Sequence, residues 1–471
     1  AMIGSLGEAY TERLRAAYAG RLPGGSDLVC YWFEKARAKV ATSTAIQVGL
    51  VSTNALRRGT NRFVLDRISE TGSIFAAWPD EEWTVEGAAV RVSLICFSKK
   101  DEARSRVLSG TTVSCINPDL SSLSADLSKA RVLPENQGVA MQGPTKGGAF
   151  EVTGAMARAW LLAPFNPNGR SNVDVVKRWF NGSAITERWN DMWIIDFGEM
   201  TEDEASLYEA PFAHIVANVK PLRMLVARDR RRRLWWQFNE TAPGVRNAIS
   251  SLERFIVSPE TPTHNVFAWL PRGVLPDKNL VVIARDDDTC FGILHSRFHL
   301  SWIRALGSPF GNHPTARRYN STRVFRTFPF PVGLGPRIPA ATYSAESGSV
   351  RIADAAKRLN DLREKWLNPP NLVRREPEVV PGLPDRALPI DASAAAILKR
   401  RTLTQLYNER PTWLANAHRE LDEAVAAAYG WPADLSDDQI LDRLLKLNHE
   451  RTVLAASGYA DGVPQAALSL T

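Results

Sequence analysis

Hydrophobic and polar positions in the first hundred residues follow helical and strand-like patterns in turn. Three short apolar runs are expected to be strands: 46–52 (IQVGLVS), which we predict to be buried, 72–77 and 90–97. Helices are expected around them, over 6–18, 27–40 and 61–69. Ser26 or Asp27 is suited to cap the second helix. Alternating helices and strands predict an α/β sheet, and we expect its strands to be parallel.

The pattern weakens over residues 101–150, where serine-rich (121–128) and glycine-rich (143–148) stretches predict a loop-dominated connection. Short strands and helices then mix from residue 150 to residue 331. The expected strands are 193–197, 266–270 and 280–285. The expected helices are 202–208, 245–254 and 293–306.

Residues 331–343 are rich in proline and glycine and predict a linker, after which helices follow. The first helix carries an apolar seam at 3-4-3-4 spacing, made of Ile352, Ala355, Leu359, Leu362 and Trp366. Such a seam packs either within the chain or between chains. A second helix is striped by Leu414, Ala417, Leu421 and Val425, with Gly430 at its expected end. Residues 436–439 (SDDQ) form a capping box that opens a third helix.

Length and composition narrow the class of protein. A chain of 471 residues is too long for one ordinary core, and about three domains are expected. Apolar residues make up 44% of the sequence, as in globular proteins. The sequence has no long apolar run and no secretion-signal pattern, so we expect no membrane segment. Four scattered cysteines without a CxxC motif argue against structural zinc and favour a reduced, cytoplasmic setting.

Positive charge concentrates in one segment of the chain. The whole sequence has a net charge of +7, yet residues 211–330 hold 18 Lys and Arg against 8 Asp and Glu, a net +10. This segment interleaves arginines with aromatic residues, beginning with Arg230, Arg231, Arg232, Arg233, Trp235 and Trp236. The pattern suits a polyanion with a stackable interior, and it predicts binding to double-stranded DNA.

The candidate DNA contacts come from this segment. The run 230–233 is expected to contact phosphates, which position a protein without reading sequence; a solvated helix face is the alternative. For Trp235 and Trp236, core packing is favoured over base stacking; adjacent side chains point to opposite sides of a strand, so at most one is expected to face DNA. Arg317, Arg318 and Tyr319 follow a turn at 311–314, and paired guanidinium groups on a loop can reach guanine in the major groove. Further candidates are Arg254, Arg297, and Arg323 and Arg326, which alternate with apolar residues and predict a strand with one basic face.

Two groups of residues suggest a metal but do not support one. Asp286, Asp287 and Asp288 are adjacent, so their carboxylates converge poorly, and a capping role is favoured. His295 and His299 are four residues apart but lack an HExxH glutamate or a cysteine partner. We predict helix packing or phosphate contacts for the histidines, and no metal site.

An ordered series of strings resembles the γ-class DNA adenine-N6 methyltransferases, specifically the fused Type IIG/IIL restriction–modification enzymes. Strings similar to motifs V, VI and VIII are 27–36 (DLVCYWFEKA), 49–59 (GLVSTNALRRG), and Trp83 followed by 87–97 (GAAVRVSLICF). Strings similar to the target-recognition domain are 254–257 (RFIV), 266–271 (VFAWLP), 282–288 (VIARDDD), 291–299 (FGILHSRFH) and 327–331 (TFPFP). The string 406–414 (LYNERPTWL) resembles the C-terminal helical region, so the likeness covers nearly the whole chain.

The resemblance implies a fold: the C-terminal half of a Rossmann-like methyltransferase sheet, then a mixed α/β target-recognition domain and a helical region. The expected boundaries are 1–115 for the methyltransferase part, 116–149 for a loop-rich connection, 150–335 for target recognition and 336–471 for the helical region. Trp83 and Ala88 correspond to the family's flipped-base pocket, with core packing as the alternative for Trp83. Asp27 corresponds to a position near the cofactor, with helix capping as an equal interpretation. Asn54 is a further pocket candidate because ligands of open α/β sheets bind at the carboxyl ends of strands.

Two motifs that the family needs are missing from the sequence. They are a glycine-rich turn that holds S-adenosylmethionine and an Asn/Asp-Pro-Pro-Tyr/Phe loop that holds the flipped adenine; in the family both lie upstream. The string 368–371 (NPPN) has no aromatic residue and is predicted to end a helix. The resemblance therefore implies a C-terminal part with an incomplete catalytic site, which binds S-adenosylmethionine only in the intact enzyme.

The expected function is to bind duplex DNA, choose the sequence and present the adenine, with the missing N-terminal methyltransferase half as partner. A non-catalytic specificity subunit of a restriction–modification complex is the alternative, although such a subunit has no need of the strings in residues 1–100. An RNA-modifying enzyme is a third possibility, and the sequence has no paired RNP aromatics that would favour it.

Overall fold

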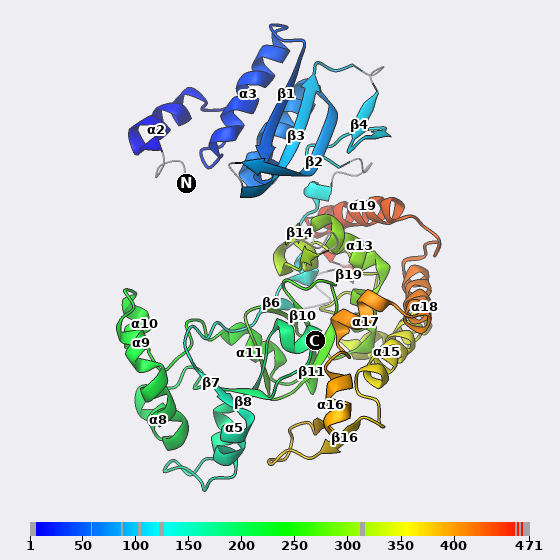
Figure 1. Cartoon of the computed structure of the whole chain (residues 1–471). Helices are drawn as coiled ribbons and strands as arrows, with labels where there is room; N and C mark the ends of the chain where they lie inside the picture. Colours follow the sequence, from blue (N-terminus) through cyan, green and yellow to red (C-terminus); the bar gives the residue numbers. More distant parts are fainter. Residues whose placement is uncertain are drawn as a thin grey trace. The chain divides into compact units, whose positions relative to one another are not determined.

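The chain divides into two compact units, Ala1–Lys129 (unit 1) and Ala130–Thr471 (unit 2), and each unit packs mainly within itself. The computed structural model describes residues 6–57, 59–85, 88–101, 105–121, 127–310, 316–456, 459–460 and 463–464 (Figure 1). Within these ranges, no helix is both long enough and apolar enough to cross a membrane.

Unit 1 is built on a five-stranded sheet in the order β1-β3-β2-β4-β5. The strands are β1 (Gln47–Thr53), β2 (Ser73–Val85), β3 (Ala88–Ser98), β4 (Arg106–Leu108) and β5 (Thr111–Val113). The helices are α2 (Glu8–Ala17), α3 (Leu28–Ala41), η1 (Asn54–Arg57), η2 (Gly59–Arg62) and α4 (Phe63–Thr71). Side chains of α3, α4, β2 and β3 share one core, in which Phe33 stacks on Phe97 with ring centroids 6.4 Å apart.

The expectation of parallel neighbours is wrong for most of this sheet. β3 is antiparallel to both β1 and β2, whereas β2 and β4 pair in parallel. β1 and β2, which are connected through α4, therefore point the same way with the reversed β3 inserted between them. β3 begins at Ala88, which pairs with Val85 at the end of β2. A connection that short joins only antiparallel strands, because a parallel crossover needs a dozen or more residues.

The apolar run at 46–52 forms an edge strand and not a buried one. β1 pairs with β3 and is the last described strand on that side of the sheet. Its side chains are exposed or half-buried with the exception of Ser52, and Val51 is 48% exposed. Ile46, just before the strand, is 86% exposed. An apolar edge with open backbone groups is a template for pairing with a further strand.

Two four-stranded sheets organise the first part of unit 2, in the orders β12-β8-β9-β7 and β11-β10-β13-β6. The first contains β7 (Glu151–Thr153), β8 (Val176–Phe180), β9 (Met192–Ile195) and β12 (Val274–Pro276). The second contains β6 (Ala140–Gln142), β10 (Arg254–Pro259), β11 (Ala268–Pro271) and β13 (Leu280–Ile283). The helices are α5 (Gly154–Leu161), α6 (Gly182–Thr186), α7 (Glu202–Ser206), α8 (Glu209–Asn218), α9 (Lys220–Met224), α10 (Asp229–Arg233) and α11 (Pro243–Ile249).

Two predicted helices of this part differ from the structure. The helix expected over 245–254 ends at Ile249, and Arg254 opens strand β10. The helix expected over 293–306 is two helices, α12 (Asp288–His295) and α13 (Arg297–Leu306). Ser296 separates them with an extended backbone (ψ 155°), and its hydroxyl donates to the Ile293 carbonyl at 2.7 Å. A short polar side chain that bonds its own backbone competes with helix continuation.

Helices dominate the C-terminal part of unit 2. They are α14 (Ala340–Tyr343), α15 (Ser347–Leu367), α16 (Ala392–Leu398), α17 (Leu403–Glu409), α18 (Thr412–Tyr429) and α19 (Asp437–Ala456), with a hairpin of β16 (Val373–Glu376) and β17 (Arg386–Pro389). Figure 1 shows α15 and α18 on the opposite side of unit 2 from α8, α9 and α10.

The apolar seam of α15 packs within the chain. Ile352 and Leu359 are fully buried, and α15 packs on α12 and α18. Gly292 of α12 is what allows the close approach: a Cβ there would lie 2.7 Å from Cγ2 of Ile352 and 3.1 Å from Cδ1 of Leu421. The alternative of a seam between chains is therefore not needed to bury these residues.

Local end signals are confirmed in this region. Gly430 ends α18 with a left-handed backbone (φ 67°). The Ser436 hydroxyl accepts from the Gln439 N–H at 3.2 Å, and the Gln439 side chain accepts from the Ser436 N–H at 2.9 Å, which is a complete capping box. α15 stops at Leu367, directly before the string 368–371.

The stretch 331–343 is hydrogen-bonded to the segment that joins strand β13 to helix α12. The guanidinium of Arg285 donates to the carbonyls of Pro336 (2.9 Å) and Ile338 (2.6 Å), and also to the Tyr343 hydroxyl. Arg285 also pairs with Asp287 at 2.7 Å. One buried arginine thus fastens this stretch to the segment between β13 and α12.

Candidate nucleic-acid interface

The basic run 230–233 lies on the short helix α10, at the end of a helical arm made of α8, α9 and α10 (Figure 1). Arg230, Arg232 and Arg233 are exposed and Arg231 is half-buried. Arg232 and Arg233 pair with Asp229 at 3.6 Å and 2.8 Å. Exposed ion pairs contribute little stability, so these guanidinium groups can exchange Asp229 for a phosphate at small cost.

The aromatic residues after the run anchor the arm instead of contacting DNA. Trp235 and Trp236 are 2% and 6% exposed and belong to the core cluster of the first sheet. Their ring N–H groups donate to Glu202 Oε1 (3.1 Å) and to the Met200 carbonyl (2.9 Å). The assignment of Trp236 as a DNA contact is therefore wrong, because neither its ring face nor its N–H is available. The two residues lie in a turn, so both can point inward.

A buried arginine, which the sequence did not single out, fixes helix α9 of the arm. Arg223 of α9 is 3% exposed and donates to Asn239 Oδ1 (2.6 Å) and to the carbonyls of Lys146 (2.9 Å) and Gln237 (3.1 Å). Burial and the nearby charge of Arg231 lower the pKa of Arg223. Its role is structural, and it removes one positive charge from those that a ligand can reach.

A second basic group lies around strand β15 (Arg317–Arg318), which pairs with β14 (Ser308–Pro309). Arg318 is 48% exposed with Glu260 at 3.7 Å, and Arg317 donates to the Arg304 carbonyl at 3.2 Å. The predicted turn at 311–314 lies outside the described residues. Tyr319 is fully buried between Phe267 and His299, and burial raises its pKa. Its assignment as a DNA contact is therefore wrong.

The strand predicted for Arg323 and Arg326 is also wrong. Residues Ser321–Phe325 form a π-helical turn, η6. The Asn320 side chain caps it by accepting from the N–H groups of Thr322 (2.9 Å) and Arg323 (3.0 Å). Arg323 is exposed and Arg326 is half-buried. The directions of the two side chains are therefore set by a helical turn and not by the alternation of a strand.

Arg254 and Arg297 are half-buried and engaged within unit 2. The guanidinium of Arg254 lies 3.8 Å from the ring centroid of Trp269 and pairs with Asp288 at 2.9 Å. Arg297 pairs with Asp437 at 3.1 Å, which links α13 to α19. A DNA contact from either residue requires these bonds to be exchanged, and both assignments remain predictions.

The acidic run and the histidines have structural roles. Asp287 caps α12, accepting from the Cys290 N–H at 2.8 Å. His295 and His299 are buried, and burial lowers their pKa values, that of His299 to about 4. Nε2 of His295 lies 2.7 Å from the Arg363 guanidinium, and Nδ1 of His299 lies 3.0 Å from the Leu294 carbonyl. Among the described residues, no group of three His, Cys, Asp or Glu side chains could hold a metal ion.

The candidates of unit 1 lie at the ends of its elements. Asp27 occupies the N-cap position of α3 without a side-chain capping bond. Instead its carboxylate accepts from Asn61 Nδ2 (2.6 Å), and its N–H donates to Asn61 Oδ1 (2.8 Å). Trp83 is 46% exposed on β2, so core packing within unit 1 is excluded for it. Asn54 follows β1 directly and Ala88 begins β3; their side chains, like residue 87, lie outside what the structure describes.

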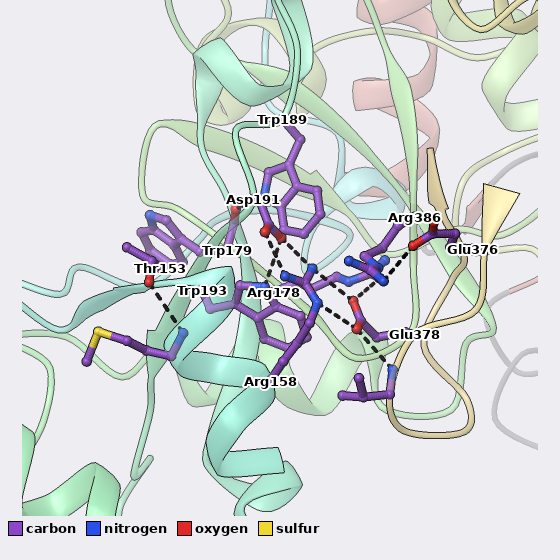
Figure 2. A network of polar contacts seen from close by, with 12 residues as sticks. Thr153, Arg158, Arg178, Trp179, Trp189, Asp191, Trp193, Glu376, Glu378 and Arg386 are labelled. Carbon is purple, nitrogen blue, oxygen red and sulfur yellow. Dashed lines mark hydrogen bonds and ion pairs between the residues drawn. The ribbon is translucent and has the colours of Figure 1, made fainter. Parts of the chain in front are cut away.

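A buried ionic network ties the first sheet of unit 2 to the β16–β17 hairpin (Figure 2). Arg158 donates both terminal nitrogens to Asp191 (2.8 Å and 2.7 Å) and its Nε to Glu378 (2.9 Å). Arg178 donates to Glu378 at 2.8 Å. Burial opposes ionisation of Glu378, but hydrogen bonds from the two arginines outweigh it and lower its pKa. The partners are far apart in the chain, and no sequence signal links them.

A cleft of about 440 Å³ lies beside this network, between the two sheets and α15. Two tryptophans line it, but their ring faces are taken. Trp269 stacks on Phe291 with centroids 4.6 Å apart while Arg254 covers it, and Trp189 stacks on Phe180 at 5.3 Å. The cleft therefore offers ring edges and not the open faces that a stacked base requires.

The chain is similar to known proteins over most of its length. Residues 175–332 match the family model described as "MmeI, target recognition domain". A structure of the Type IIL restriction–modification enzyme MmeI in complex with DNA superposes with a TM-score of 0.68 and 19% identity, covering 95% of this chain and 55% of that chain. DNA methyltransferase A of Bacillus subtilis (strain 168) is 24% identical over 473 residues, covering 92% of this chain and 45% of the relative. The chain thus spans about half the length of the relatives it matches.

Proposed function

We propose that this chain is the DNA-binding and target-recognition portion of a site-specific DNA adenine-N6 methyltransferase of a restriction–modification or phage-defence system. In the intact enzyme, a methyl group passes from S-adenosylmethionine to N6 of adenine. The observation that carries the proposal is the match of residues 175–332 to a target recognition domain model. The matched segment falls inside residues 150–335, which we propose as the recognition domain, and it contains the exposed arginines of α10.

The cofactor belongs to the part of the enzyme outside this chain. Asp27, the cofactor-proximal candidate, already has its carboxylate bonded to Asn61, and the sequence has no glycine-rich turn to approach a cofactor closely. These residues alone do not make a site for S-adenosylmethionine. The exposed apolar edge at β1 supports a missing half, because a further strand of the methyltransferase sheet would cover it. The four cysteines, which lie far apart in the sequence without a CxxC motif, support a cytoplasmic setting.

Binding of the chain to a random-sequence duplex, measured by fluorescence anisotropy at several salt concentrations, tests the DNA-binding part of the proposal. We expect affinity to fall steeply with salt, since each phosphate contact adds about 0.9 to the slope of log K against log salt. Selection of bound sequences from a random DNA pool then tests recognition. Enrichment of one sequence supports target recognition. Salt-sensitive binding without enrichment would instead mean that the chain binds DNA without choosing a sequence.

Addition of an upstream methyltransferase half tests the enzymatic part. We expect the two parts together to transfer labelled methyl groups to adenine in the enriched sequence, and neither part alone. If the two parts bind each other and the DNA but transfer nothing, a non-catalytic specificity subunit becomes the better interpretation.

A further inference from the structure

The tip of the helical arm combines exposed leucines with exposed arginines. Leu222 and Leu225, one helical turn apart, are 63% and 83% exposed, and Met224 beside them is 42% exposed. Residues 219–233 also hold seven Lys and Arg against one Asp, a net +6. An apolar surface within such a positive field is not explained by phosphate contacts alone, which need only the cations.

Helix α9, which carries Leu222, is held firmly. Arg223 of this helix is buried and makes three hydrogen bonds to residues outside the arm. The Lys220 ammonium lies 4.5 Å from the ring centroid of Trp235, which is itself in the core. The leucines at the tip are therefore presented by a fixed support, and binding them to a ligand costs little ordering of the backbone.

We infer that this tip is an apolar wedge for duplex DNA: Leu222 and Leu225 pack into the minor groove against a base step while arginines of α10 hold the adjacent phosphates. Proteins that bend DNA insert apolar side chains between base steps with cations alongside, which is the combination found here. Charge complementarity selects a polyanion as the occupant of this surface. The inference rests on the proposed DNA binding and adds to it a place and a mode of contact.

Two double variants separate the apolar part of the tip from the ionic part. Leu222→Ser with Leu225→Ser is expected to weaken binding to a random duplex about ten-fold or more while the salt slope stays unchanged. Arg232→Ala with Arg233→Ala is expected to reduce the slope of log K against log salt by roughly 2, the loss of two phosphate contacts. All four side chains are exposed, so both variants should melt like the unchanged chain.

Matched controls lie on other faces of unit 2. Ile397→Ser on α16 replaces an exposed apolar residue (44%), and Arg419→Ala on α18 replaces an exposed arginine (69%). Both controls should leave affinity and slope unchanged. Energy transfer between dyes at the two ends of the duplex reports bending, and we expect the leucine variant to bend the duplex less at saturating protein.

The outcomes distinguish this inference from the proposed function. If the unchanged chain binds and the leucine variant binds and bends the duplex equally well, the wedge is refuted while DNA binding stands. The wedge is also refuted, and DNA binding stands, if the leucine variant loses binding to phosphatidylserine vesicles but not to DNA. That result would make the tip a lipid-binding surface. If the unchanged chain does not bind any duplex at low salt, both the wedge and the proposed function of this chain fail.

Discussion

Replacing Glu378 by alanine should lower the free energy of unfolding of unit 2 more than replacing an exposed acidic residue does. The Glu378 side chain is fully buried, and it accepts hydrogen bonds from Arg158 and Arg178, whose side chains are 14% and 5% exposed. Removing the carboxylate leaves Arg178 buried without its carboxylate partner, while Arg158 keeps Asp191. Breaking a buried pair by removing one partner costs about 3–5 kcal/mol, because the remaining charge is left uncompensated.

The neighbouring pair provides the control. Glu376 lies two residues earlier and pairs with Arg386 at 2.8 Å, but its side chain is 33% exposed. Glu376→Ala should therefore cost only about 0–1 kcal/mol. Urea unfolding followed by circular dichroism measures both variants against the unchanged chain. For a unit of this size, a loss of 3–5 kcal/mol lowers the thermal midpoint by very roughly 4–7 °C. Equal midpoints for the two variants would refute the reasoning.

The dependence on pH gives the same interaction a second signature. The arginines lower the pKa of Glu378 in the folded state, so its contribution is fully present above the ordinary glutamate pKa of about 4.3. The contribution is lost as the pH falls through the lowered value. The difference in unfolding free energy between the unchanged chain and Glu378→Ala should therefore be constant from pH 6 to 8 and shrink in acid. A difference that grows in acid would contradict the assignment of the network.

Three further changes test the interior of unit 2. Trp236→Ala should cost about 3–5 kcal/mol of stability, as truncation of a buried aromatic does, yet leave the salt slope of DNA binding unchanged. If the variant instead binds DNA more weakly and melts at the same temperature as the unchanged chain, Trp236 contacts DNA after all. Gly292→Ala should cost about 1–3 kcal/mol, since its Cβ would meet Ile352 at 2.7 Å, and thermal melting measures this. Burial raises the pKa of Asp422 to about 7, so folding stability falls as the pH rises from 4 to 7; Asp422→Asn should flatten this dependence in melts over the same range.

Several helix ends could be predicted because their signals are local, although the helices expected over 245–254 and 293–306 have other bounds. The seam of α15, the end of α18 at Gly430 and the capping box at Ser436 each depend on residues within a few turns. The sheet of unit 1 was harder, because strand direction depends on the length of a connection. The short step from β2 to β3 reverses the strand, and residue pattern alone does not show it.

Burial of single aromatic residues could not be predicted from their neighbours in sequence. Tyr319 follows two arginines, which suggested a DNA contact, yet its side chain is in the core. Trp236 was also a candidate contact, although core packing was favoured for it, and its side chain is in the core. Contacts from distant segments decide this: Met200 accepts from Trp236, and Phe267 packs on Tyr319. The Arg158–Glu378 contact spans 220 positions and is equally invisible in a sequence pattern.

The net charge of +10 over residues 211–330 is therefore larger than the charge that a duplex meets. Arg223 and Arg285 are buried and bonded to backbone carbonyls, and Arg254 and Arg297 already neutralise aspartates. Among the exposed cations that remain, the largest groups lie on α10 and around β15. Since the salt slope counts phosphates that are contacted and not charges that are present, it should be set by these two groups. A binding surface read from sequence as one basic island is, in the folded chain, two separate clusters on a scaffold that uses its other arginines to hold itself together.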